Sequence, residues 1–248
     1  RAFADRAEYM GDADFYKVPA KTLVSDQYLQ QRMKDYVAGI AGSSRQIRPG
    51  DMPAKESEQT THLSVIDKDG NAVAVKTTLN NSYGSKTVVA GAGFFLNDEM
   101  DDFSAKPGVP NLYGAVGGEA NAIAPGKRML SSMAPTIVLK NGKPYVVVGT
   151  PGGTTIPTSV FQTLVDILEF DMSTEDAVYK PKFHHQWLPD SLFVEKEFPN
   201  AVRQSLEKMG YPLIQRDEIG RTEVIRVLPG GKFEAVGDIR GDDDAEGW

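Results

Sequence analysis

Two β-hairpin patterns constrain the fold of this chain more than any other feature. Residues 61–67 and 72–79 flank the turn sequence Lys-Asp-Gly-Asn, and residues 135–139 and 144–149 flank Lys-Asn-Gly-Lys. The first pair alternates between polar and apolar side chains, and both pairs are rich in β-branched residues. Short glycine-containing connections between such segments are typical of antiparallel hairpins. The sequence therefore predicts two antiparallel hairpins separated by a long connection.

Helices are expected between the second hairpin and the C-terminal part of the chain. Residues 155–170 have apolar side chains at helical spacing, with Val160, Leu164, Ile167 and Leu168 expected to face inward. A shorter helix should begin at the cap sequence 173–176 and end before Pro181, and another should cover residues 199–209. Two further strands should surround the turn at residues 229–232. Hairpins followed by helices and then strands favour a layered α+β sandwich over a parallel βαβ sheet.

The first 59 residues differ in character from the rest. Residues 1–50 are polar and predicted to be helical, with a periodic stretch that continues through Met33, Val37 and Ile40. Within residues 41–57, glycine, serine, proline and charged residues dominate, as in an exposed connector. Such a connector can be cut without damage to a core. Because residue 1 is an arginine in a helix-like segment, we expect the chain to begin inside a longer protein.

Composition excludes several classes of function. The net charge is −7 and the basic residues form no runs, so no nucleic-acid partner is expected. The absence of cysteine excludes disulfides, thiolate metal sites and a cysteine nucleophile. No segment has the apolar length needed to span a bilayer. His184 and His185 are adjacent, and neighbours on a strand point to opposite faces, so we expect packing or hydrogen bonding rather than a metal there. No metal or other cofactor is predicted.

The remaining nucleophile candidates are hydroxyl groups. A hydroxyl needs a base, and a free N-terminal amine can serve the side chain of its own residue. Thr60 opens a strand directly after the connector, so cleavage between Gln59 and Thr60 would create such an amine. Its ordinary pKa of about 7.7–8.0 suits a general base. The competing interpretation is that Thr60 and Thr61 are simply β-prone residues at the start of a strand.

Other polar groups leave alternatives open on pattern alone. The turn 149–155 contains Gly152 and Gly153, whose backbone N–H groups could stabilise an oxyanion or could belong to an ordinary tight turn. Ser131 and Ser132 precede an apolar strand and could bind a ligand or merely begin that strand.

An acidic pair and a long loop complete the set of candidates. Glu99 and Asp102 lie three residues apart and could hold an ammonium group, a metal ion, or only face solvent. The glycine- and proline-rich stretch 105–127 is too long for a passive connection, and loops of this length are usually functional.

In their order and spacing, these segments resemble the bacterial γ-glutamyltranspeptidase family, over nearly the whole chain. The resemblance rests on the segments 59–62, 67–73, 97–107, 130–133, 151–153 and 183–189. It implies an α+β fold of the N-terminal-nucleophile hydrolase class, a four-layer αββα sandwich of which this chain would hold a part. Residues 1–59 would be the end of the large subunit, and residues 60–248 the small catalytic subunit.

The resemblance also implies catalytic roles for individual residues. Thr60 matches the self-processing nucleophile, released by cleavage after Gln59, and Thr78 matches the threonine that contacts it. Gly152 and Gly153 match the oxyanion hole. Tyr113 matches the tip of a lid loop over the bound glutamyl group.

Substrate binding follows in the same way. Asn80, Glu99 and Asp102 match the residues that hold the α-amino end of a γ-glutamyl group, and Ser131 and Ser132 match the pair that binds its α-carboxylate. The implied substrates are glutathione and other γ-glutamyl compounds, with water, an amino acid or a dipeptide as acceptor. The implied partner is the rest of the large subunit, which would supply an arginine, and the implied location is periplasmic or secreted. The alternative function is a glutaryl (cephalosporin) acylase on the same scaffold.

Overall fold

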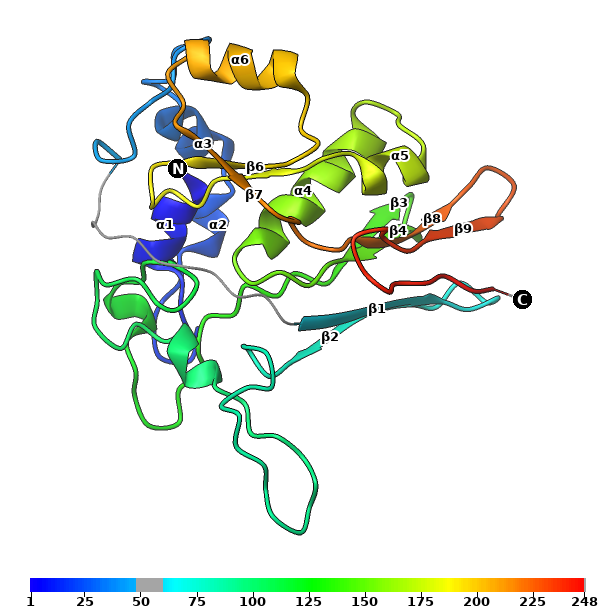
Figure 1. Ribbon diagram of the computed structural model, residues 1–248, viewed down its shortest axis with the longest axis horizontal. Helices are drawn as coiled ribbons and strands as arrows, with labels where there is room; N and C mark the ends of the chain where they lie inside the picture. Colours follow the sequence, from blue (N-terminus) through cyan, green and yellow to red (C-terminus); the bar gives the residue numbers. More distant parts are fainter. Residues whose placement is uncertain (48–59, 248) are drawn as a thin grey trace.

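The computed structural model describes residues 1–47 and 60–247. Its layered part contains an antiparallel four-stranded sheet in the order β3-β4-β8-β9 (Figure 1). The strands of this sheet are β3 (Thr136–Lys140), β4 (Lys143–Gly149), β8 (Glu223–Val227) and β9 (Phe233–Val236). Both β3–β4 and β8–β9 are hairpins, as the turn sequences predicted.

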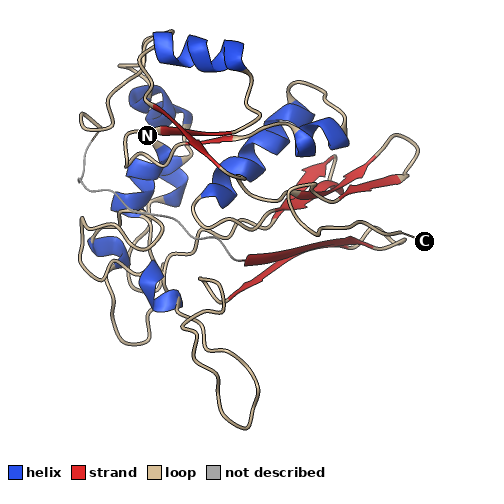
Figure 2. Ribbon diagram, viewed as in Figure 1, coloured by secondary structure: helices blue, strands red, loops and turns tan. Residues whose placement is uncertain are grey.

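The β1–β2 hairpin forms a second layer against this sheet (Figure 2). Strands β1 (Thr60–Ile66) and β2 (Ala72–Thr78) pair in a register that sets Thr60 opposite Thr78 and His62 opposite Lys76. These four residues share the inward face. His62 lies so close to β4 that a Cβ on Gly149 would fall 2.2 Å from its ring. The hairpin therefore directs Thr60 into the interior between the two sheets.

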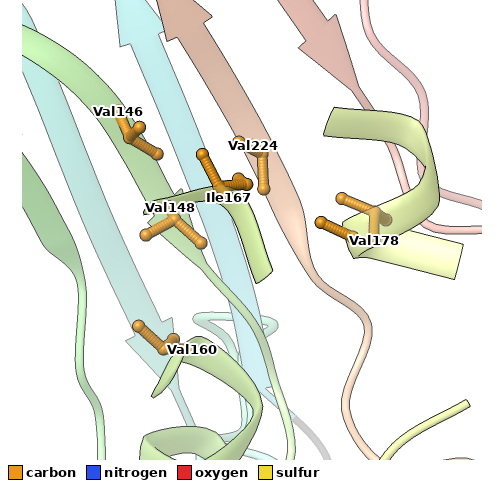
Figure 3. Packing of buried hydrophobic residues seen from close by; sticks show 7 residues of the cluster. Val146, Val148, Val160, Ile167, Val178 and Val224 are labelled. Atoms are coloured by element: carbon orange, nitrogen blue, oxygen red, sulfur yellow. The ribbon is translucent and has the colours of Figure 1, made fainter. Parts of the chain in front are cut away.

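Helices cover the other face of the four-stranded sheet. Helix α4 (Thr155–Leu168) and helix α5 (Thr174–Tyr179) begin and end close to the predicted positions, and the Ser173 side chain caps α5 by accepting from the Asp176 N–H. Their apolar side chains meet those of the sheet in the largest buried cluster, as Figure 3 shows for Val146, Val148, Val160, Ile167, Val178 and Val224.

One predicted core position on α4 is wrong. Leu164 is partly buried, but Leu168 is 44% exposed, because it occupies the last turn, where the helix passes beyond the sheet.

A third sheet departs from the prediction. Strands β5 (Phe183–His184), β6 (Leu192–Glu195) and β7 (Leu213–Arg216) form it, and β6 pairs with β7 in parallel. Helix α6 (Asn200–Lys208) connects these two strands, as a parallel pair requires. The expected antiparallel sandwich thus carries one βαβ unit, whose short strands gave too little alternation to be recognised.

The N-terminal part is helical over shorter segments than expected. It contains α1 (Ala2–Tyr9), α2 (Ala20–Leu23) and α3 (Asp26–Arg32). The periodic stretch does not continue as a helix: Met33, Val37 and Ile40 lie in turns and irregular segments and are exposed. A helix of this size depends on packing of its apolar face, and this face has no buried contact. Most of the predicted connector, residues 48–57, lies outside the described part.

The described residues supply three of the four layers expected of an αββα sandwich: the α4–α5 layer, the four-stranded sheet and the β1–β2 hairpin. The outer face of the hairpin carries exposed apolar side chains, namely Leu63, Val65, Val73 and Val75. None of the helices in residues 1–47 and 60–247 is long and apolar enough to cross a membrane.

Candidate active site

An open pocket lies where the β1–β2 hairpin meets the loops around the four-stranded sheet. It brings together eight of the predicted site residues from six separate segments of the chain. The pocket is lined by Thr60, Thr78, Asn80, Asp102, Tyr113, Ser131, Ser132, Met133, Gly153 and Ile156. Two predicted residues, Glu99 and Gly152, are next to lining residues but do not line it, and Gln59 lies outside the described part.

The pairing of β1 with β2 brings two threonines together at the edge of the pocket. The Oγ1 atoms of Thr60 and Thr78 are 3.2 Å apart. Thr78 Oγ1 also accepts a 2.9 Å hydrogen bond from the Asn80 N–H, which restrains the direction of the hydroxyl. Asn80 is buried at φ 75°, a conformation in which asparagine is tolerated. The local hairpin therefore fixes the Thr60–Thr78 contact.

The turn between β4 and α4 presents backbone N–H groups beside this pair. Gly152 and Gly153 have φ values of 133° and 52°, in the region that favours glycine. The carbonyl of Gly152 accepts from the N–H and the hydroxyl of Thr155. Across residues 1–47 and 60–247, no acceptor is recorded for the N–H of either glycine. Hydrogen bonds to its carbonyl groups thus hold the turn in place, and the N–H groups of the two glycines remain available to a ligand.

Tyr113 holds the long loop against the pocket. Its ring lies on Gly153, where an added Cβ would fall 2.8 Å from the ring, and its hydroxyl donates to the Asn80 carbonyl. The carbonyl of Tyr113 accepts from Gln186 Nε2 at 3.0 Å. Tyr113 is 4% exposed. Tyr113 therefore anchors the loop at the wall of the pocket, and the role of the loop as a lid stays a prediction.

One carboxylate, that of Asp102, reaches the pocket from the 3₁₀ helix η1 (Glu99–Asp102). Burial raises the pKa of Asp102 to about 7, Arg6 opposes this, and the neighbouring Asp101, Glu99 and Asp98 add to it. Burial also raises the pKa of Glu99, with a contribution from Asp98. Asp102 alone of the predicted pair lines the pocket. A cation bound there would favour the charged form of Asp102.

Two residues that the sequence did not predict form hydrogen bonds with the segments that carry Asp102 and the serines. Asn121, in the 3₁₀ helix η2 (Glu119–Asn121), donates to the Asp102 carbonyl at 2.7 Å and accepts from the Leu130 N–H at 3.0 Å. Arg6 of α1 donates to Ser132 Oγ at 3.0 Å. No local sequence signal marked either residue, because both contacts join segments that are far apart in the chain.

Ionisable side chains also lie behind the Thr60–Thr78 pair, between the two sheets. Burial and the nearby Lys76 lower the pKa of His62 to about 4. Burial lowers the pKa of Lys76 to about 7, although Glu223 opposes the shift, and Lys76 Nζ donates to the Thr150 carbonyl. Burial raises the pKa of Glu223 to about 7. The surroundings of His62, Lys76 and Glu223 therefore disfavour the charged form of each side chain.

The adjacent histidines point apart, as expected. His184 is fully buried and contacts Thr158 Oγ1 and Gln186 Oε1, each at 2.8 Å, whereas His185 lies 3.6 Å from Asp190. The described part of the chain contains no group of three or more His, Cys, Asp or Glu residues suited to a metal ion.

Comparisons with known proteins agree with this arrangement. The model of the γ-glutamyltranspeptidase family matches residues 1–248. The glutathione hydrolase proenzyme of Escherichia coli is 49% identical over 243 residues, a match that covers 98% of this chain and 42% of that protein. The chain therefore spans less than half the length of this relative. A structure of γ-glutamyltranspeptidase from Pseudomonas nitroreducens is 47% identical with a TM-score of 0.73, covering 76% of this chain and 99% of that one.

The similarity to solved structures identifies the fold class, and the family model identifies the family. The fold is that of the N-terminal-nucleophile hydrolases. A cephalosporin acylase from Bacillus halodurans shares it with a TM-score of 0.83, covering all of this chain and 43% of that one, but at 24% identity this likeness concerns the fold alone. The chain belongs to the γ-glutamyltranspeptidase family.

Proposed function

We propose that the protein cleaves γ-glutamyl amides, such as glutathione, through a γ-glutamyl ester on Thr60. One observation carries this proposal: the Thr60–Thr78 hydroxyl pair opens into a pocket that also holds a carboxylate and two serine hydroxyls. The group would pass to water, or to an amino acid or dipeptide in transpeptidation. The names of the relatives, glutathione hydrolase and γ-glutamyltranspeptidase, support this assignment.

The chemistry follows from the groups around Thr60. Its free α-amine takes the hydroxyl proton while Oγ1 attacks the γ-carbonyl carbon, and Thr78 orients the attacking oxygen. The open N–H groups of Gly152 and Gly153 stabilise the tetrahedral oxyanion, an interaction worth about 3–4 kcal/mol per donor. The amine then gives its proton to the leaving nitrogen. In the second half, water or the acceptor amine attacks the ester and restores Thr60.

The amine exists only after the bond between Gln59 and Thr60 is broken. We assign that cleavage to Thr60 itself, whose Oγ1 attacks the Gln59 carbonyl in an N-to-O acyl shift followed by hydrolysis of the ester. Residues 1–59 then end the large subunit and residues 60–248 form the small one. The share of this chain matched by the separate chain of the Pseudomonas nitroreducens structure, 76%, equals the share formed by residues 60–248 and supports this boundary.

The γ-glutamyl group carries an α-ammonium and an α-carboxylate. Its recognition therefore needs an anionic group near the first and hydrogen-bond donors near the second. Asp102, aided by Asn80 and Glu99, faces the α-ammonium, and Ser131 and Ser132 donate to the α-carboxylate. A glutaryl group has no ammonium, so an acylase would gain nothing from a buried carboxylate at this position. Asp102 in the pocket therefore favours γ-glutamyl substrates over the alternative of a glutaryl acylase.

The remaining partners follow from the family. The glutathione hydrolase relative from Escherichia coli is longer, and we infer that the rest of a large subunit would cover the exposed outer face of the β1–β2 hairpin and contribute an arginine to the site. We place the protein in the periplasm or outside the cell, as the resemblance to bacterial members implies.

The test uses the full-length protein and its Thr60→Ala variant. Intact-mass analysis should find two fragments in the wild type, the smaller with Thr60 at its N-terminus, and one uncut chain in the variant. The cut protein should release p-nitroaniline from γ-glutamyl-p-nitroanilide. Turnover by protein whose Gln59–Thr60 bond is intact would refute the mechanism.

Two further variants separate the carboxylates. Asp102→Ala should raise KM more than Glu99→Ala does, because Asp102 lines the pocket and Glu99 lies beside it. An unchanged KM in Asp102→Ala would remove the ammonium site from the proposal.

A further inference from the structure

Arg6 connects the two ends of the pocket. Its Nη2 donates to Ser132 Oγ at 3.0 Å, a contact between residues 126 positions apart. The same guanidinium acts on Asp102 and opposes the rise in the pKa of that carboxyl. Burial lowers the pKa of Arg6 itself, and Asp102 counteracts this. Arg6 thus contacts the group assigned to the substrate carboxylate and supports the group assigned to the ammonium.

The surroundings of Asp102 otherwise disfavour its charge. Burial is the largest cause, and the negative charges of Asp101, Glu99 and Asp98 act in the same direction. Against them stands the positive charge of Arg6. An opposite charge close to a buried carboxyl typically lowers its pKa by about 1–3 units. Removal of Arg6 should therefore leave Asp102 largely protonated at neutral pH.

The contact with Ser132 has a second consequence. A serine hydroxyl has one hydrogen to donate and two lone pairs to accept with. Because Ser132 Oγ accepts from Arg6, its own hydrogen stays available for an acceptor in the pocket. A carboxylate is such an acceptor.

The position of Arg6 does not depend on its own side chain. On the same helix, Ala4 and Ala7 are 2% and 3% exposed and pack against a cluster that includes Trp187 and Leu188. The carbonyl of Ala7 accepts from the Gly118 N–H at 2.8 Å. Substitutions at Arg6 should therefore leave α1 in place.

We propose that Arg6 is a positioning residue of this pocket, which turns the Ser132 hydroxyl toward the substrate carboxylate and favours the charged form of Asp102 for the substrate ammonium. This inference rests on the proposed function. It gives the segment before the cleavage site a part in binding after cleavage, since α1 must stay docked for the pocket to keep its charge.

The test compares Arg6→Gln, Arg6→Lys and the wild type in the full-length, processed protein. In the pH profile of kcat/KM for γ-glutamyl-p-nitroanilide, Arg6→Gln should shift the midpoint of the acidic limb to a pH about one unit higher. With Asp102 titrating near pH 7, this makes kcat/KM about fivefold lower at pH 7, with recovery at higher pH. Arg6→Lys should keep the limb close to that of the wild type.

Two controls isolate Asp102. Loss of a positive charge would also raise the pKa of the Thr60 amine, so Arg6→Gln is repeated with Asp102→Asn, where the shift of the limb should vanish. Arg32→Gln breaks the 2.9 Å ion pair between α3 and Asp5 of α1, outside the pocket, and should leave the limb unchanged. A lower kcat/KM in Arg6→Gln with an unmoved limb would reduce Arg6 to a structural role and overturn the inference.

A readout without turnover keeps this inference separate from the proposed function. A ¹³C NMR titration of the aspartate carboxyls, with the Asp102 signal identified by its loss in Asp102→Asn, should show a higher midpoint in Arg6→Gln than in the wild type. An equal midpoint overturns the inference even if the enzyme is active. Absence of any γ-glutamyl turnover refutes the proposed function instead.

Discussion

The β1–β2 hairpin and the β3-β4-β8-β9 sheet lie against one another, but the side chains on their strands differ in polarity and in burial. Val146, Val147 and Val148 of β4 are completely buried, so both faces of that strand are covered by apolar or close-packed groups. The inward face of the hairpin carries Thr60, His62, Lys76 and Thr78 instead, and its outer face is exposed.

This difference separates stability from chemistry. On one face of β4, Val146 and Val148 pack with the helices in one apolar core, whereas Val147 is buried on the opposite face. The hairpin contributes polar side chains whose burial is unfavourable. Its packing against the sheet offsets this cost. Substitutions in the two layers should therefore affect different properties.

The largest effect is expected in the helix layer of the four-stranded sheet. Ile167→Ala on α4 should lower the free energy of unfolding by about 2–5 kcal/mol, because it leaves a cavity among closely packed side chains. Chemical denaturation measures this loss, and kcat per folded molecule should not change. The matched control is Leu168→Ala, one residue further on and 44% exposed, where the cost should be far smaller. Equal costs at the two positions would contradict the core assignment.

The second effect concerns pH and belongs to the hairpin. The folded pKa of His62 is about 4, below the ordinary 6.5, so the unfolded chain binds its proton first as the pH falls. The stability contributed by neutral His62 is complete above pH 6.5 and is lost as the pH falls toward 4, by about 3 kcal/mol. His62→Gln should lose less stability between pH 7 and pH 4 than the wild type. Parallel losses in urea titrations would show that His62 does not cause this acid sensitivity.

The sequence predicted those parts of the molecule that local pattern determines. The register of β1 with β2 follows from a turn four residues long. The contact between Thr60 and Thr78 could therefore be predicted from the hairpin pattern together with the family resemblance. Arg6 and Asn121 were not predicted, because their roles arise from tertiary contacts. The contact from Arg6 to Ser132 spans 126 residues, and no local periodicity encodes such a distance.

The same reasoning accounts for the errors. The parallel pairing of β6 with β7 depends on a crossover through α6, and its four-residue strands show no clear alternation. Conversely, the stretch from Met33 to Ile40 has helical periodicity but no surface to pack on, so it forms turns and irregular segments.

A third effect tests the hydroxyl pair. Thr78→Val keeps the shape of the side chain but removes the oxygen that lies 3.2 Å from Thr60 Oγ1. Because we propose that this contact orients Thr60 as the nucleophile, kcat should fall by roughly 10- to 100-fold, as expected for loss of a hydrogen bond worth about 1–3 kcal/mol. The control is Thr77→Val, the exposed neighbour on the outer face, which should keep the wild-type kcat. An unchanged kcat in Thr78→Val would remove Thr78 from the catalytic arrangement.

The smallest effect returns to the layer that supplies stability. Ser173 caps α5 with a 3.1 Å hydrogen bond from the Asp176 N–H, at a position where the helix end faces solvent. Ser173→Ala should cost about 1 kcal/mol of unfolding free energy, whereas Ser173→Thr should cost less because threonine also caps helices. Neither variant should alter kcat or KM, since α5 packs on the sheet face opposite the hairpin. A change in kcat without a change in stability would mean that the α5 layer reaches the nucleophile, and the division between the two layers would then be wrong.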